Sequence, residues 1–127
     1  MEDFMLGNGR YTLIDNIRQR RIIKMFHFVE TQLFTRLVQE YLSDDDYAQL
    51  QQTLMANPRI GEVIPGTGGV RKMRWRVAGR GKRGGIRVIY FLRLTQGQIW
   101  LLTLYAKNVT DTIPAHVLKQ IKDEIDG

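Results

Sequence analysis

The stretch from Val70 to Leu94, "VRKMRWRVAGRGKRGGIRVIYFLRL", alternates polar and apolar residues on both sides of a glycine-rich centre. Such alternation is typical of β-strands, because successive side chains of a strand point to opposite faces of the sheet. We predict two antiparallel strands, Val70–Val77 and Ile86–Leu94, joined through the glycines. A third strand, Gln98–Ala106 ("QIWLLTLYA"), follows a tight turn at Gly97 and completes an antiparallel meander.

The glycine-rich centre also contains the string G-x-G-x-x-G, at Gly79, Gly81 and Gly84. A dinucleotide-binding loop of this pattern requires a following helix and an acidic residue about twenty positions later. Here a strand-like segment follows, and no acidic residue occurs before Asp111. The Gly-Lys-Ser/Thr of a P-loop is also missing. We therefore expect a hairpin tip rather than a nucleotide-binding loop.

The segments on either side of the meander predict a further strand and three helices. Ser43 precedes Asp44–Asp46, so we expect it to cap a helix that Pro58 ends. The expected order is a strand (25–30), two helices (31–42 and about 44–57), a loop (61–69), the meander and a last helix (112–125) with Thr112 as its cap and Pro114 in its first turn. The fold class is α+β: N-terminal strand, helical hairpin, three-stranded antiparallel meander and C-terminal helix. We expect the helices on one face of the sheet.

The length of 127 residues fits one compact domain. We predict a single domain over residues 25–127 and an N-terminal extension over residues 1–24, with packing of that segment onto the domain as the alternative. The chain has no cysteine, which excludes disulfides, thiolate metal sites and thiol nucleophiles. Its start lacks a secretory signal and its apolar runs are too short for a membrane span, so we expect a soluble, cytoplasmic protein.

The net charge of +6 is unevenly distributed. The segment from Val63 to Thr110 contains ten basic residues and no Asp or Glu, whereas the rest of the chain has nine basic and thirteen acidic residues. When charges are segregated in this way, the clustered basic residues repel one another unless a polyanion faces them. Nucleic acid is the leading candidate for that polyanion, and a solvated basic face without a partner is the alternative.

Strand parity sorts these cations onto one face of the predicted sheet. One face of the first strand holds Val70, Lys72, Arg74 and Arg76, and the other holds Arg71, Met73, Trp75 and Val77. The second strand separates Ile86, Val88, Tyr90, Leu92 and Leu94 from Arg87, Ile89, Phe91 and Arg93, and the third separates Trp100, Leu102 and Leu104 from Thr103, Tyr105 and Lys107. Antiparallel pairing then gathers Lys72, Arg74, Arg87, Tyr105 and Lys107 on the face without helices.

Two aromatic residues on this face, Phe91 and Tyr105, are candidates for stacking on the bases of single-stranded RNA. Ordinary core packing is the alternative, and it is the better interpretation for either residue taken singly. The cations differ, because a core cannot accept unpaired Arg and Lys side chains.

Catalysis on such a face must use cations and a tyrosine. His27 and His116 lie outside the basic segment, and we interpret them as structural or surface residues. RNA cleavage fits this set, because the substrate's own 2′-hydroxyl is the nucleophile. Arg87 and Lys107 are candidates to stabilise the developing phosphate charge, and Lys72 or Lys107 is the candidate proton acceptor or donor.

From Met25 onward the chain resembles the RelE/ParE superfamily of bacterial toxins, most closely its HigB-like members. The resemblance is carried by "GTGGVRKMRWRVAGRGKRGGIRVIY" (Gly66–Tyr90) and "IWLLTLYAKN" (Ile99–Asn108). It implies a RelE-like fold and the toxin of a type II toxin–antitoxin pair. Such a toxin cuts mRNA in the ribosomal A site without metal or other cofactor. It is neutralised by a cognate antitoxin, for which we expect a helix-turn-helix DNA-binding domain.

The resemblance also implies roles for particular residues. Lys72 and Arg74 match positions that contact RNA and ribosome, Arg87 matches the arginine that stabilises the transition state, and Lys107 stands where members have Arg or Lys. The Tyr or His base of some members would fall within 108–113 and is absent, so Tyr105 is the substitute. The expected catalytic set is Arg87, Lys107, Lys72 and Tyr105, and the expected RNA or ribosome contacts are Arg71, Arg74, Arg76, Arg80, Lys82 and Arg83.

Two other functions remain open from the sequence. A toxin of the ParE branch would poison DNA gyrase by protein–protein contact and would need no phosphate chemistry. A passive RNA-binding module would use the same cations, bind RNA with strong salt dependence and leave no cut ends.

Overall fold

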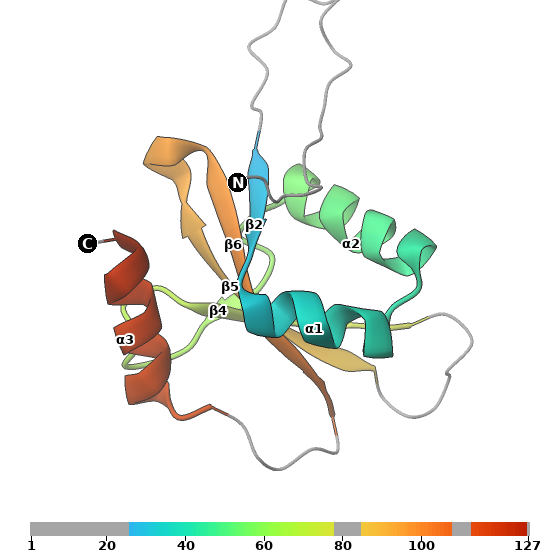
Figure 1. The fold of residues 1–127 in the computed structure, drawn as a ribbon. Helices are drawn as coiled ribbons and strands as arrows, with labels where there is room; N and C mark the ends of the chain where they lie inside the picture. Colours follow the sequence, from blue (N-terminus) through green and yellow to red (C-terminus); the bar gives the residue numbers. More distant parts are fainter. Residues whose placement is uncertain (1–25, 78–84, 108–112, 127) are drawn as a thin grey trace, which may run out of the picture.

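The computed structural model describes residues 26–77, 85–107 and 113–126. In chain order the elements are β2 (His27–Glu30), α1 (Gln32–Tyr41), α2 (Asp44–Ala56), β3 (Glu62–Val63), β4 (Arg71–Trp75), β5 (Ile86–Arg93), a 3-10 turn (Leu94–Gln96), β6 (Gln98–Ala106) and α3 (Ala115–Asp126) (Figure 1). They form an α+β domain with a mixed sheet in the order β2-β6-β5-β4-β3, in which β2 alone pairs in parallel, with β6. The α+β prediction and its meander are confirmed. The predicted extension, residues 1–24, and the predicted cap Thr112 lie outside the described residues.

The helical hairpin begins each of its helices with a side-chain cap. Ser43 accepts a hydrogen bond from the Asp46 amide at 3.0 Å and so starts α2, as predicted. Thr31 caps α1 in the same way through the Phe34 amide, and its hydroxyl also donates to the Leu102 carbonyl at 2.7 Å. This second bond fixes the start of α1 on β6, which lies between β2 and β5 in the sheet.

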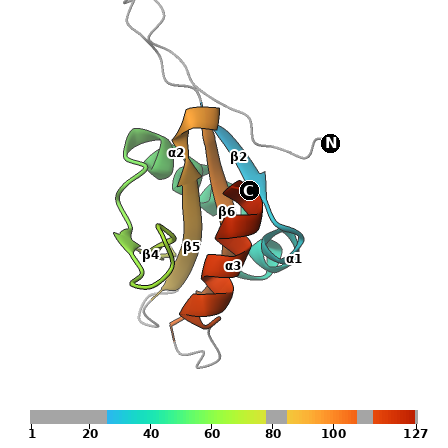
Figure 2. The same ribbon diagram turned by 90° about the vertical axis from the view of Figure 1, so that its left-hand side faces the viewer.

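The three helices lie on both faces of the sheet, so the prediction of a single helical face is wrong. Figures 1 and 2 show α1 and α2 on one side of the strands and α3 on the other. Two apolar clusters explain this arrangement. One joins α1 and α2 to the sheet around Phe34, Leu50 and Leu54, and the other joins α3 to the opposite face around Leu118. No helix within the described ranges is long and apolar enough to cross a membrane.

A β-bulge in β6 supplies part of the second apolar cluster. Ile89 faces Thr103 and Tyr90 faces Leu101, so Leu102 is the extra residue between them. A bulge disrupts the strict alternation of side chains. Leu102 therefore packs in the cluster with Leu118. The predicted parity placed Leu102 opposite Thr103 and is wrong for that reason.

The short edge strand β3 lies within the segment 61–69 that was expected to be only a loop. It is held in place from the core: the Tyr90 hydroxyl accepts a hydrogen bond from the Gly61 amide at 2.8 Å and donates to the Pro58 carbonyl at 2.7 Å. Arg71 donates to the Gly61 carbonyl at 2.6 Å. Because of these bonds, β3 pairs with β4, and Glu62 stands opposite Lys72.

Candidate nucleic-acid interface

The register of the meander aligns three functional side chains across three strands. Arg74 of β4 is the partner of Arg87 of β5, and Arg87 is the partner of Tyr105 of β6. Directly opposed residues of neighbouring strands point to the same face and have adjacent side chains. Lys72 and Lys107 lie two residues from Arg74 and Tyr105 along their chains, and both are exposed. We call this set of five residues the basic row; the structure brings together the predicted catalytic residues within it.

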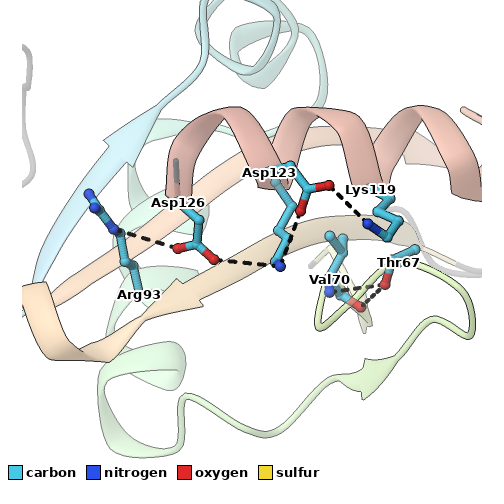
Figure 3. Close-up of polar contacts among 7 residues, drawn as sticks. Thr67, Val70, Arg93, Lys119, Asp123 and Asp126 are labelled. Carbon is cyan, nitrogen blue, oxygen red and sulfur yellow. Dashed lines mark hydrogen bonds and ion pairs between the residues drawn. The ribbon is translucent and has the colours of Figure 1, made fainter.

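The positive charge of the basic row is not neutralised by acidic residues of the described chain. Within the described ranges, no carboxylate forms an ion pair with a member of the row, including Glu62 opposite Lys72. Two acidic residues of α3 engage other cations: Asp126 lies 3.7 Å from Arg93, and Asp123 lies 2.9 Å from Lys119 (Figure 3). Considering the described residues alone, the end of the sheet that carries the row is therefore positively charged.

Arg87 contains an unsatisfied buried donor. Its side chain is only partly accessible, and its Nη1 atom is buried without a hydrogen-bond partner among the described residues. Buried donors without partners are rare in native proteins because each costs free energy. A phosphate oxygen would satisfy this donor, since guanidinium groups bind phosphates through strong charge-assisted hydrogen bonds.

Tyr105 is the neutral member of the row. Burial raises the pKa of its phenol above the usual value of 10.0, and the nearby charge of Arg87 acts in the opposite direction with a smaller effect. The phenol is therefore protonated at neutral pH. It can donate a hydrogen bond, or a proton, next to the group that Arg87 binds.

A hollow of about 120 Å³ lies beside the row, between the sheet and the start of α3. Lys72 and Tyr105 belong to both the row and the hollow, and the remaining lining residues are Ile64, Ile89, Thr103, Ile113 and Leu118. Sequence reasoning missed this hollow. The shared parity of Thr103 and Tyr105 pointed to the correct face, but the position of α3 over that face did not follow from parity.

The other predicted contact residues are spread over different parts of the molecule. Arg71 faces α1 and α2, where its guanidinium bonds to the carbonyls of Arg59 and Gly61, so it does not join the row. Arg76 is exposed just beyond β4. Arg80, Lys82 and Arg83 lie outside the described residues.

The second stacking candidate, Phe91, is a core residue. It is 6% exposed and packs under α3, with the Lys122 ammonium 5.8 Å from its ring centre. Its interpretation as an RNA-stacking residue is wrong, and the alternative of core packing holds. His27 and His116 are exposed on β2 and α3. The described part of the chain contains no group of three metal-ligating side chains.

No family model matches the chain. Among solved structures, a chain of the archaeal RelE–RelB complex from Pyrococcus horikoshii OT3 is similar, with 18% sequence identity and a TM-score of 0.47. The match covers 67% of this chain and 98% of that chain. At this level of overlap the likeness establishes neither family nor activity, and the function proposed below rests on the basic row.

Proposed function

We propose that the protein is the toxin of a type II toxin–antitoxin pair and inhibits translation as a ribosome-dependent mRNA endonuclease. The observation that carries this proposal is the alignment of Arg74, Arg87 and Tyr105 on one sheet face, with a buried, unsatisfied donor at its centre. The sequence resemblance to HigB-like toxins supports the same activity.

In the proposed reaction the 2′-hydroxyl of the substrate attacks the adjacent phosphorus, and the bond from phosphorus to the 5′-oxygen breaks. The products are a 2′,3′-cyclic phosphate and a free 5′-hydroxyl. Arg87 stabilises the negative charge that builds up on the phosphate oxygens. Protonated Tyr105 supplies the proton for the leaving 5′-oxygen. One of the two exposed lysines of the row, Lys72 or Lys107, accepts the proton of the 2′-hydroxyl as a neutral amine, and the other, as an ammonium group, adds positive charge beside the phosphate.

The positive charges of the basic row also indicate which partners the protein binds. The exposed cations Lys72, Arg74 and Lys107 bind the backbone of mRNA, and Arg76 extends the positive surface toward ribosomal RNA. The cognate antitoxin carries an acidic or amphipathic segment that covers the basic row. Its helix-turn-helix domain is expected from the resemblance.

The experiment that tests this proposal adds the purified protein to a translating extract and maps the 5′ ends of the mRNA. Discrete new ends with 5′-hydroxyl groups support the nuclease. Salt-dependent RNA binding without cuts would show instead that the protein is a passive RNA-binding module. Intact mRNA together with inhibition of gyrase supercoiling would show that the protein acts like the ParE branch. The row of cations argues against this alternative, because contact with gyrase needs no phosphate chemistry.

A further inference from the structure

The hollow beside the basic row has the composition of a small ligand site. Its walls are mostly aliphatic and are formed by Ile64, Ile89, Ile113 and Leu118. The polar groups that reach it are Thr103, Tyr105 and Lys72. A mostly apolar concavity with a few polar groups is the usual form of a site for a small molecule.

Thr103 indicates that the hollow is built for a ligand with hydrogen-bonding groups. It is 5% exposed, and among the described residues its hydroxyl has no hydrogen-bond partner. Because Thr103 lines the hollow and its hydroxyl forms no bond within the described residues, this hydroxyl is available to an occupant of the hollow. Its neighbour Tyr105 keeps its proton at neutral pH. Two hydroxyl groups are thus offered to one occupant.

We propose that the hollow receives one nucleobase of the bound RNA, that of a nucleotide next to the reacting phosphate. The aliphatic walls contact the ring, the Thr103 hydroxyl bonds to its edge, and the Tyr105 oxygen accepts a hydrogen bond from that edge, which leaves the Tyr105 proton for the 5′-oxygen. The phosphate of the same nucleotide meets Arg87 and Lys72. This inference rests on the proposed function, and it makes the hollow the part of the site that senses base identity.

Size and charge favour a base over other occupants. An engineered aliphatic and aromatic cavity of roughly 150 Å³ binds benzene, so the hollow of about 120 Å³ accepts a single ring and little more. Lys72 at the rim favours an occupant that brings negative charge with it. An apolar side chain of a protein partner would fill the volume and leave Thr103 unbonded.

The test titrates the full-length protein with three kinds of probe and follows NMR signals. The probes are the four nucleoside 5′-monophosphates, the free nucleosides and ribose 5-phosphate. The methyl groups of Ile89, Ile113 and Leu118 report on the hollow, and the amides of Arg87 and Lys107 report on the row. We expect the single-ring pyrimidine nucleotides to shift both sets, the free pyrimidine nucleosides to shift the hollow set, and ribose 5-phosphate to shift the row set alone.

Two variants and one control link these shifts to the hollow. Thr103→Val keeps the side-chain shape and removes the hydroxyl, so nucleotide affinity should fall roughly five- to tenfold while ribose 5-phosphate affinity stays unchanged. Leu118→Phe fills the space and should abolish the shifts of the isoleucine methyl groups. Thr95→Val makes the same change at an exposed position in the turn after β5 and should bind like the wild type.

The outcomes separate this inference from the proposed function. If no nucleotide or nucleoside shifts the hollow methyl groups, or if Thr103→Val binds every nucleotide like the wild type, the inference is wrong. Shifts of the row with ribose 5-phosphate would then still support the phosphate site. If free nucleosides shift the signals of the hollow but ribose 5-phosphate does not shift those of the row, base binding is supported and the proposed phosphate chemistry is wrong.

Discussion

Arg87 and Tyr105 are directly opposed partners in the β5–β6 ladder, and they place a cation beside a phenol that keeps its proton. Burial raises the pKa of Tyr105, and the charge of Arg87 only partly counteracts it. In the proposed reaction, phosphate binding and proton donation therefore meet at one point of the sheet. The function proposed for this face depends on that pair.

Replacing Tyr105 tests its role as a proton donor. Tyr105→Phe removes only the hydroxyl and should slow mRNA cleavage about a hundredfold or more. Because the pKa of the phenol is raised from 10.0, its ionisation should not limit wild-type cleavage between about pH 6 and pH 9. Cleavage rates measured across this range check both points. A variant that cuts at the wild-type rate would remove Tyr105 from the mechanism.

The exposed cations of the row should set the salt dependence of RNA binding. Lys72→Ala and Arg74→Ala should each weaken binding of a single-stranded RNA and lower the slope of log affinity against log salt by about 0.7. The matched control is Arg36→Ala, which removes an exposed charge from α1 on the opposite face. Fluorescence anisotropy at several salt concentrations gives the slopes. An equal loss of slope in Arg36→Ala would show that binding is not confined to the row.

Tyr90 should stabilise the fold through its buried hydroxyl. Tyr90→Phe loses the bonds to Gly61 and Pro58 and should lower the free energy of unfolding by about 1–3 kcal/mol, measured by urea denaturation.

We also predict that the protein loses stability at high pH because the Tyr90 hydroxyl ionises. Burial raises the pKa of Tyr90 in the folded state, so its contribution is complete below the unfolded pKa of about 10 and is lost as the pH rises through the folded pKa. Stability of the wild type should fall in this alkaline window, and stability of Tyr90→Phe should fall less. Parallel curves for the two proteins would contradict this account.

Gly85 should be required where the chain enters β5. Its φ is +85°, and an added Cβ would lie 2.6 Å from the Trp75 carbonyl oxygen. Gly66 is the matched control, because its φ of +81° is similar but its nearest neighbour would be 3.9 Å away. Gly66→Ala should cost about 1–2 kcal/mol for the backbone conformation, and Gly85→Ala should cost more because of the clash. Equal losses in urea denaturation would exclude the clash as a cause.

The sequence predicted most elements because their signals are local. Ser43 and the aspartates after it mark the start of α2, and the alternation in β4 and β5 places Lys72, Arg74 and Arg87 on one face. The side on which a helix packs is not a local property. Ile89 and Phe91 point to the same face as Arg87, so another element must bury them. Only the three-dimensional structure identifies that element as α3.

The hollow was not predictable for a related reason. It depends on the bulge at Leu102, which turns Leu102 and Thr103 toward the same face, and on the start of α3. No residue type in β6 marks that bulge. The edge strand β3 was missed because it is two residues long and is held by Tyr90, a residue distant in sequence.

The most direct test of the central claim compares Arg87→Ala with Arg93→Ala in a translating extract. Both arginines lie on β5 and share a face, but Arg93 is paired with Asp126, whereas Arg87 holds one of the two buried donors without a partner among the described residues, the other being Trp75 Nε1. We predict that the wild type and Arg93→Ala cut mRNA at the same discrete sites and that Arg87→Ala cuts at least about a hundredfold more slowly. Undiminished cutting by Arg87→Ala, or mRNA left intact by the wild type, would contradict the account.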